Sequence, residues 1–234
     1  MIQLESPNHG PRPDGCEVDM LVLHYTGMPD RESALARMCD PTAQVSAHYC
    51  IDEEGQVYQL VDEGRRAWHA GRSFWRRPDD INDRSIGIEL VNPGHEFGYR
   101  AFPEVQMRAL RDLARAILWR HPIPPQNVVG HSDIAPLRKQ DPGELFNWQR
   151  MARWGVGLWP PADEERQMDQ DRPVDEIQMM LAAYGYDVPN SGILDAPTRA
   201  VITAFQRHFR PRRVDGRLDF ETVRQLEILN ELVG

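Results

Sequence analysis

The sequence lacks several features that would define its class at once. It has only three cysteines, Cys16, Cys39 and Cys50, and none of them forms a CxxC pair. A disulfide framework or a cysteine-based zinc knuckle is therefore not expected, and reduced thiols favour a cytoplasmic protein. Neither a signal-peptide pattern nor an apolar run long enough to span a membrane is present. The alternative is a periplasmic or extracellular protein whose leader has been removed.

Basic residues are fewer than acidic ones, 27 against 36. The 234 residues carry a net charge of −9, which argues against nucleic acid or an anionic membrane surface as the main partner. Lys139 is the only lysine among 27 basic residues. A compact ammonium differs from a rigid guanidinium fork, so this lysine suggests a role that arginine would not fill; the alternative is chance.

The length predicts one medium domain followed by a small one. Residues 162–172 are polar and charged without hydrophobic periodicity, as in a linker. We therefore expect a first domain over residues 1–160, a linker over 161–173 and a second domain over 174–234.

The first part mixes strand and helix patterns. Apolar runs predict strands at residues 20–23, 57–61, 85–91 and 127–130, and helical spacing predicts helices at 30–39 and 104–120. This pattern predicts an α/β (mixed α+β) fold with a central mixed β-sheet flanked by helices.

The second part contains an internal repeat. Residues 191–198 and 215–222 share Gly, Leu-Asp and Thr at equal offsets, which indicates a glycine turn followed by an aspartate that caps a helix. Helices are expected at 174–184, 196–209 and 220–232. Three short helices around one small core favour a binding module over a second catalytic unit.

No HExxH, G-x-S-x-G or glycine-rich phosphate loop is present, and the candidate chemistry is scattered. His24 and His131 each directly follow an apolar strand, and Asp141 comes ten positions after His131. Two histidines and a carboxylate make a plausible open zinc site, with the fourth position left for water. A hydrogen-bonded core histidine is the alternative for His24.

Glu89 lies within the predicted strand at 85–91. Strand alternation places it on the face opposite Ile86, Ile88 and Leu90. It is either a solvent-facing glutamate or a partly buried general base with a raised pKa.

Several motifs in order carry a resemblance to a known family. They are LVLHYTG (21–27), SAHYCIDEEGQVYQLV (46–61), AWHAG (67–71), INDRSIGIELVN (81–92) and GHSDIAPLRKQDPG (130–143). With them, most of residues 1–160 resembles the zinc-dependent N-acetylmuramoyl-L-alanine amidases, which share their fold with the peptidoglycan-recognition proteins. Residues 174–234 resemble the three-helix peptidoglycan-binding domain, and a generic three-helix module is the alternative.

The resemblance implies one Zn²⁺ per chain, held by His24, His131 and Asp141. It implies that Glu89 handles the proton of the attacking water and that Lys139 stabilises the oxyanion. Tyr49 and His69 match positions that line the substrate cleft. The implied reaction is hydrolysis of the amide bond between N-acetylmuramic acid and L-alanine in peptidoglycan or in muropeptides, including the 1,6-anhydro form. The alternatives are a recognition protein that binds peptidoglycan without cutting it and a phage-type lytic amidase.

Overall fold

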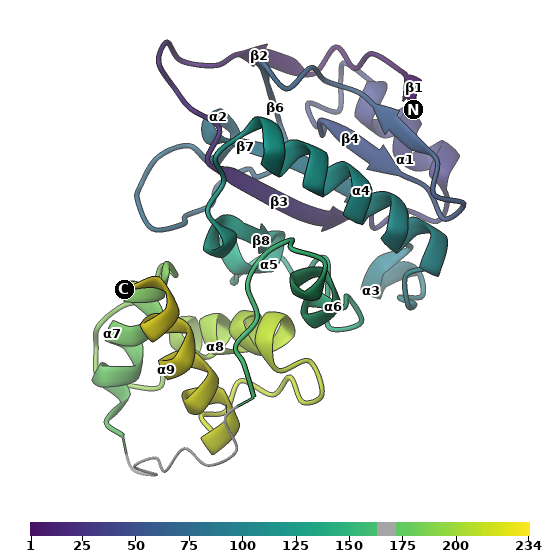
Figure 1. Ribbon diagram of the computed structural model, residues 1–234. Coiled ribbons are helices and arrows are strands. Elements are labelled where there is room, and N and C mark those ends of the chain that lie inside the picture. Colours follow the sequence, from purple (N-terminus) through teal and green to yellow (C-terminus); the bar gives the residue numbers. More distant parts are fainter. Residues whose placement is uncertain (163–171) are drawn as a thin grey trace.

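The structure is a computed structural model that describes residues 1–162 and 172–234, and its N-terminal part is built on a six-stranded sheet (Figure 1). Four strand pairings are parallel and the pairing of β4 with β5 is antiparallel. The expected α/β class with a central mixed sheet is confirmed. In spatial order the strands are β1 (Ile2–Gln3), β5 (Val57–Gln59), β4 (Tyr49–Ile51), β7 (Ser85–Leu90), β3 (Met20–Tyr25) and β8 (Val128–Gly130). A separate antiparallel ribbon pairs β2 (His9–Pro11) with β6 (Arg65–Ala67).

One face of the sheet packs against the helix α4 (Glu104–Arg120) (Figure 1). This helix buries Leu110, Ala114 and Ile117 against side chains of β3 and β7 such as Leu23 and Ile88. Each large apolar side chain buried in this way contributes about 1.5–3 kcal/mol. The helical spacing at 104–120 therefore predicted this helix with the bounds that it has in the structure.

The opposite face of the sheet is covered by two separate groups of residues. The helix α1 (Arg31–Cys39) packs there against Cys50 of β4, and it begins at Asp30, whose carboxylate accepts a 2.7 Å hydrogen bond from the Ser33 amide. Met20 and Val22 of β3 pack instead against residues from the C-terminal helices. His24 alternates with these two residues along β3 and so belongs to the same face.

Several short helical segments connect the main elements. Each is too short to show a hydrophobic period in the sequence, and none was predicted. They are α2 (Ile81–Arg84), α3 (Gly94–Phe97), the 3₁₀ turn η1 (Pro125–Asn127), α5 (His131–Ile134) and α6 (Trp148–Arg153).

The C-terminal part consists of α7 (Val174–Tyr184), α8 (Ala196–Phe209) and α9 (Phe220–Val233), close to the expected bounds. The repeat behaves as expected. Asp195 and Asp219 accept hydrogen bonds of 2.9 and 3.0 Å from the backbone amides of Thr198 and Thr222, so each aspartate caps a helix. The repeated glycines before them have φ of +69° and +66°, a backbone conformation that favours glycine.

These helices share a core with the sheet instead of enclosing a small one of their own. Trp75 and Met20 from the N-terminal part lie in one buried cluster with Ile177, Tyr184 and Phe205. The apolar core is therefore continuous across the expected domain boundary. Of the expected linker, residues 163–171 lie outside the described residues.

Candidate metal centre and cleft

His24 is placed by the two central strands of the sheet. It lies near the end of β3, is 1% exposed, and is the register partner of Glu89 on the parallel strand β7. The residues before it form an apolar run that is buried on both faces, which fixes the strand at the centre of the sheet. The ring therefore sits on a rigid element, on the face away from α4.

His131 and Asp141 reach the same edge of the sheet from the neighbouring strand. β8 pairs in parallel with β3, and His131 directly follows β8 as the first residue of α5. The Ser132 amide donates a 2.9 Å hydrogen bond to the Asp141 carbonyl, which holds the loop carrying Asp141 beside α5. Parallel strands end at a common edge, so residues far apart in sequence meet there.

The three side chains converge within hydrogen-bonding distance. The Nδ1 atoms of His24 and His131 are 3.0 Å apart, and each lies 3.1 Å from Oδ2 of Asp141. They form a buried group of potential metal ligands whose donor atoms lie within 4.8 Å of one another. In tetrahedral zinc sites with bonds of about 2.0–2.1 Å, neighbouring ligand atoms are about 3.3 Å apart. The spacing of the three atoms therefore suits a small tetrahedral cation.

The protonation states of these groups also suit a cation. Burial, followed by the neighbouring His131, lowers the pKa of His24 to about 4, so its ring is neutral at pH 7. Burial alone would raise the pKa of Asp141, but the two histidines hold it well below its usual range. The Nε2 atom of His131 lies 3.0 Å from the Ala70 carbonyl, which can only accept, so it donates and leaves Nδ1 with a free lone pair. Such a histidine–histidine–carboxylate set suits zinc better than magnesium or calcium.

A cleft of about 560 Å³ opens beside this group. That volume lies within the range of small-molecule sites. Five of the residues singled out from the sequence line it, and His24 lies buried behind them. The five are His69, Glu89, His131, Lys139 and Asp141.

Glu89 lies in the cleft as an unusual carboxylate. Its Oε2 atom is buried and has no hydrogen-bond partner among the described residues. Burial, and then the charge of Asp141, raises the pKa of Glu89 well above its usual value, while Lys139 opposes this shift. A carboxylate oxygen that is buried without a partner is costly unless it has a function, such as accepting a proton.

Lys139 lines the same cleft from the loop after α5. Its backbone amide donates to the Ala135 carbonyl at 3.0 Å, which continues the turn out of that helix. Its positive charge acts on both His24 and Glu89. The only lysine of the chain is therefore beside the proposed metal ligands.

His69 and Tyr49 have different positions. His69 lines the cleft and places Nδ1 3.0 Å from Nε2 of His24. Tyr49 lies outside the cleft: it packs in the cluster beneath α4, and its hydroxyl donates a 2.7 Å hydrogen bond to Glu63. Strand alternation explains this, because Cys50, and not Tyr49, is the register partner of Glu89. The role expected for Tyr49 in the substrate cleft is therefore withdrawn.

Other cleft residues were not predicted from the sequence. Tyr25 and His95 line the cleft, with the Tyr25 hydroxyl 2.9 Å from Nδ1 of His95. Tyr25 directly follows His24, and that adjacency was the only signal available for it. His95 lies on α3, a helix of four residues without a recognisable pattern.

Within residues 1–162 and 172–234, no helix is both long and apolar enough to cross a membrane.

Comparison with known proteins identifies both parts of the chain. Residues 14–144 match the family described as N-acetylmuramoyl-L-alanine amidase, and residues 170–226 match the putative peptidoglycan binding domain. The chain is 42% identical to N-acetylmuramoyl-L-alanine amidase AmiD of Escherichia coli (strain K12), over 93% of this chain and 84% of that protein. It is 33% identical to 1,6-anhydro-N-acetylmuramyl-L-alanine amidase AmpD of Haemophilus influenzae, over 63% of this chain and 88% of that one.

Solved structures give the same result. The complex of AmiD from Escherichia coli with anhydro-N-acetylmuramic acid-L-Ala-D-gamma-Glu-L-Lys superposes with a TM-score of 0.84 at 40% identity, covering 95% of this chain and 93% of that one. AmpDh3 from Pseudomonas aeruginosa, in complex with anhydromuramic pentapeptide, also has a TM-score of 0.84, at 38% identity and with 94% of each chain covered.

Proposed function

Because the chain belongs to the N-acetylmuramoyl-L-alanine amidase family, we propose that it uses one Zn²⁺ ion, held by His24, His131 and Asp141, to cut the bond between N-acetylmuramic acid and L-alanine. The observation that carries this proposal is the buried triangle of two Nδ1 atoms and one carboxylate oxygen, two of whose residues, His131 and Asp141, line the cleft. Three protein ligands leave a fourth position for water or substrate.

In the proposed mechanism, bound zinc supplies a Lewis acid that polarises the scissile carbonyl and acidifies the attacking water. Glu89 accepts the proton of that water at the oxygen that has no partner within the described chain, and later returns one to the leaving amine. Lys139 stabilises the negative charge that develops on the carbonyl oxygen. The rigid strands beneath the site hold Glu89 and His24 side by side, so little reorganisation is needed.

The proposed substrate is a peptidoglycan fragment with its stem peptide. The two superposed structures hold anhydromuramyl peptides, and the cleft has room for a ligand of that class. We further propose that residues 1–160 form the catalytic unit, and that residues 174–234 hold the enzyme on peptidoglycan.

The test is metal analysis combined with mass spectrometry of the products. The purified chain is incubated with soluble anhydro-muropeptides and with intact sacculi, beside an Asp141→Asn variant that lacks one ligand charge. We expect one zinc ion per chain and release of free stem peptide by the wild type only.

Preference for soluble fragments would favour the cytoplasm that the free thiols suggest, and preference for sacculi would favour the periplasm or the exterior. Absence of both zinc and released peptide, after zinc is added back, would leave a protein that binds peptidoglycan without cutting it.

A further inference from the structure

The outer nitrogens of the two proposed histidine ligands meet one short piece of chain. Nε2 of His24 lies 3.0 Å from Nδ1 of His69, and Nε2 of His131 donates to the carbonyl of Ala70 at 3.0 Å. A neutral imidazole offers a lone pair on one nitrogen only, so the partner of the outer nitrogen decides whether the inner one can bind a metal. The dipeptide His69–Ala70 therefore acts on both ligands.

The position of each proton follows from Ser85. Its hydroxyl donates its one proton to the Ile81 carbonyl at 2.6 Å, so its oxygen can only accept from Nε2 of His69, 3.1 Å away. Nδ1 of neutral His69 then carries a lone pair and accepts a hydrogen bond from Nε2 of His24. Consequently Nδ1 of His24 is free of hydrogen and faces the metal position.

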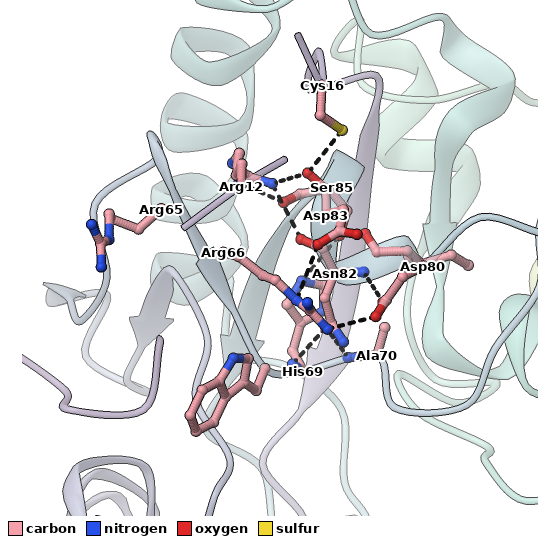
Figure 2. A network of polar contacts seen from close by, with 12 residues as sticks. Arg12, Cys16, Arg65, Arg66, His69, Ala70, Asp80, Asn82, Asp83 and Ser85 are labelled. Carbon is pink, nitrogen blue, oxygen red and sulfur yellow. Dashed lines mark hydrogen bonds and ion pairs between the residues drawn. The ribbon is translucent and has the colours of Figure 1, made fainter. Parts of the chain in front are cut away.

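One side-chain oxygen holds the backbone amides of both residues, and Arg138 donates a further hydrogen bond to the Ala70 carbonyl. Oδ1 of Asn82 accepts hydrogen bonds from the backbone amides of both His69 and Ala70, at 3.0 and 2.9 Å (Figure 2). Asn82 is 6% exposed and lies on α2. Its backbone amide donates a 3.0 Å hydrogen bond to the carboxylate of Asp80, which caps this helix. Figure 2 shows the side chain of Asn82 reaching from α2 toward these two residues.

The neighbouring strand leaves little freedom to the His69 ring. A Cβ atom added at Gly87 on β7 would come within 2.5–2.7 Å of three atoms of that ring. Glycine at this position is therefore needed for the ring to lie against β7. The ring is confined by Gly87 on one side, and its backbone is fixed by Asn82.

We propose that Asn82 is a positioning residue for the metal centre. It fixes His69 and Ala70, which together direct Nδ1 of both His24 and His131 toward the zinc ion. This inference rests on the zinc site of the proposed function. Asn82 itself touches neither metal nor substrate and acts through two hydrogen-bonded intermediates.

Two measurements on the full chain test the proposal. The first is the histidine tautomer in metal-free protein, read from ¹⁵N NMR shifts of the imidazole nitrogens. The second is the zinc dissociation constant, measured by competition with a chelator. In the wild type we expect His24 and His131 to carry their proton on Nε2. In Asn82→Ala we expect mixed tautomers and zinc affinity weakened by about 10-fold or more, as for other outer partners of metal ligands.

The conservative variant and a matched control separate positioning from folding. Asn82→Asp keeps the accepting oxygen, so zinc affinity is expected to return to within about threefold of the wild type. Asn127→Ala removes another buried asparagine side chain, which contacts Trp75 and the Asp19 carbonyl away from the metal. It is expected to lower stability but to leave zinc affinity and the histidine tautomers unchanged.

The outcomes are distinct. Folded Asn82→Ala with wild-type tautomers and zinc affinity would overturn the inference, as would equal losses in Asn82→Ala and Asn127→Ala. If Asn82→Ala does not fold, Gly87→Ala provides the test, because its methyl group displaces the His69 ring; unchanged zinc affinity there would likewise overturn it. Failure of the wild type to bind zinc would instead count against the proposed function, and the tautomers of the metal-free protein would still be informative.

Discussion

The hydroxyl of Tyr186 donates a 2.6 Å hydrogen bond to Oδ1 of Asp133, and both residues are almost fully buried. Asp133 is two residues beyond His131, and its other oxygen accepts from the Gly130 amide and from Nδ1 of His208, both at 2.8 Å. The carboxylate thus joins the C-terminal helical part to the turn that carries a proposed zinc ligand. The C-terminal part therefore helps to hold the turn at His131 in place, in addition to any role in binding peptidoglycan.

We predict that Tyr186→Phe lowers the free energy of unfolding by about 1.5–3 kcal/mol, because a buried charged acceptor loses a donor. Urea denaturation measures the change. Tyr184→Phe is the matched control, since its hydroxyl makes no hydrogen bond within residues 1–162 and 172–234. Equal effects of the two variants would show that the contact to Asp133 contributes little.

Glu89→Ala is predicted to retain zinc and to lose about 10²–10⁴-fold in kcat, the usual contribution of a general base. Metal analysis and product release under saturating substrate are the measurements. Glu96→Ala is the control, because Glu96 also lines the cleft but is exposed on α3. Turnover by Glu89→Ala near that of the wild type would remove Glu89 from the mechanism.

Lys139→Ala is predicted to retain zinc and to lose about 10²–10³-fold in kcat, as expected when one stabilising charge is removed from a developing oxyanion. Lys139→Arg should recover little of this loss, because the planar guanidinium cannot take the place of a compact ammonium. The steady-state rates of the three proteins on one muropeptide decide this. Full recovery by arginine would mean that only the charge matters at this position.

A pH-dependent contribution to stability lies on the far side of the sheet, at Glu63. Burial alone would raise the pKa of this carboxylate, but hydrogen bonds from Arg120, Tyr49 and His121 lower it from 4.5 to about 2. A depressed folded-state pKa gives stability that is fully present above the unfolded value and is lost as the pH falls through the folded value.

We therefore predict that Glu63→Gln destabilises the chain by about 1–2 kcal/mol at pH 7, a figure reduced from the full linkage value because the group is partly solvated. The difference between wild type and variant should shrink between about pH 4.5 and pH 2. Unfolding free energies measured across this range provide the check, with the exposed Glu5→Gln as control. A difference that does not change with pH would show that the network is not charge-dependent.

The convergence of the proposed metal ligands could largely be predicted from the sequence, because it follows from the order and direction of the strands. His24 and His131 each come at the end of an apolar run, and parallel strands bring such positions to one edge. Glu89 was assigned to the correct face by alternation alone. The three C-terminal helices were also predicted, since apolar periods are local signals and α8 and α9 also have aspartate caps.

Tyr49 was expected in the substrate cleft because of the family resemblance, and not because of strand alternation. The strand at Tyr49–Ile51 has three residues, too few for the sequence to define its register. A shift of one position turns a side chain to the opposite face of a sheet. Tyr49 accordingly lies beneath α4, where its hydroxyl donates a hydrogen bond to Glu63 and does not face the cleft.

The residues that position the proposed metal ligands could not be predicted from the sequence, for a different reason. The Ala70 carbonyl binds His131 through a backbone atom, and no side-chain pattern reports such a contact. Asn82 lies on a helix of four residues, and its partners are 12 and 13 positions away. The docking of the C-terminal helices onto Asp133 is equally long-range and has no local signature.

The pairing of His24 with Glu89 across β3 and β7 has a consequence for how this scaffold can be redesigned. Backbone hydrogen bonds between adjacent strands, and not the intervening chain, set the spacing of this pair. Loops between residues 26 and 84 that carry none of His69, Ala70 and Asn82 can accordingly be lengthened or exchanged to reshape the cleft while this pair keeps its spacing. Deleting one residue inside β7 would leave every loop intact, but it would place an aliphatic side chain where Glu89 now faces the proposed metal ligands.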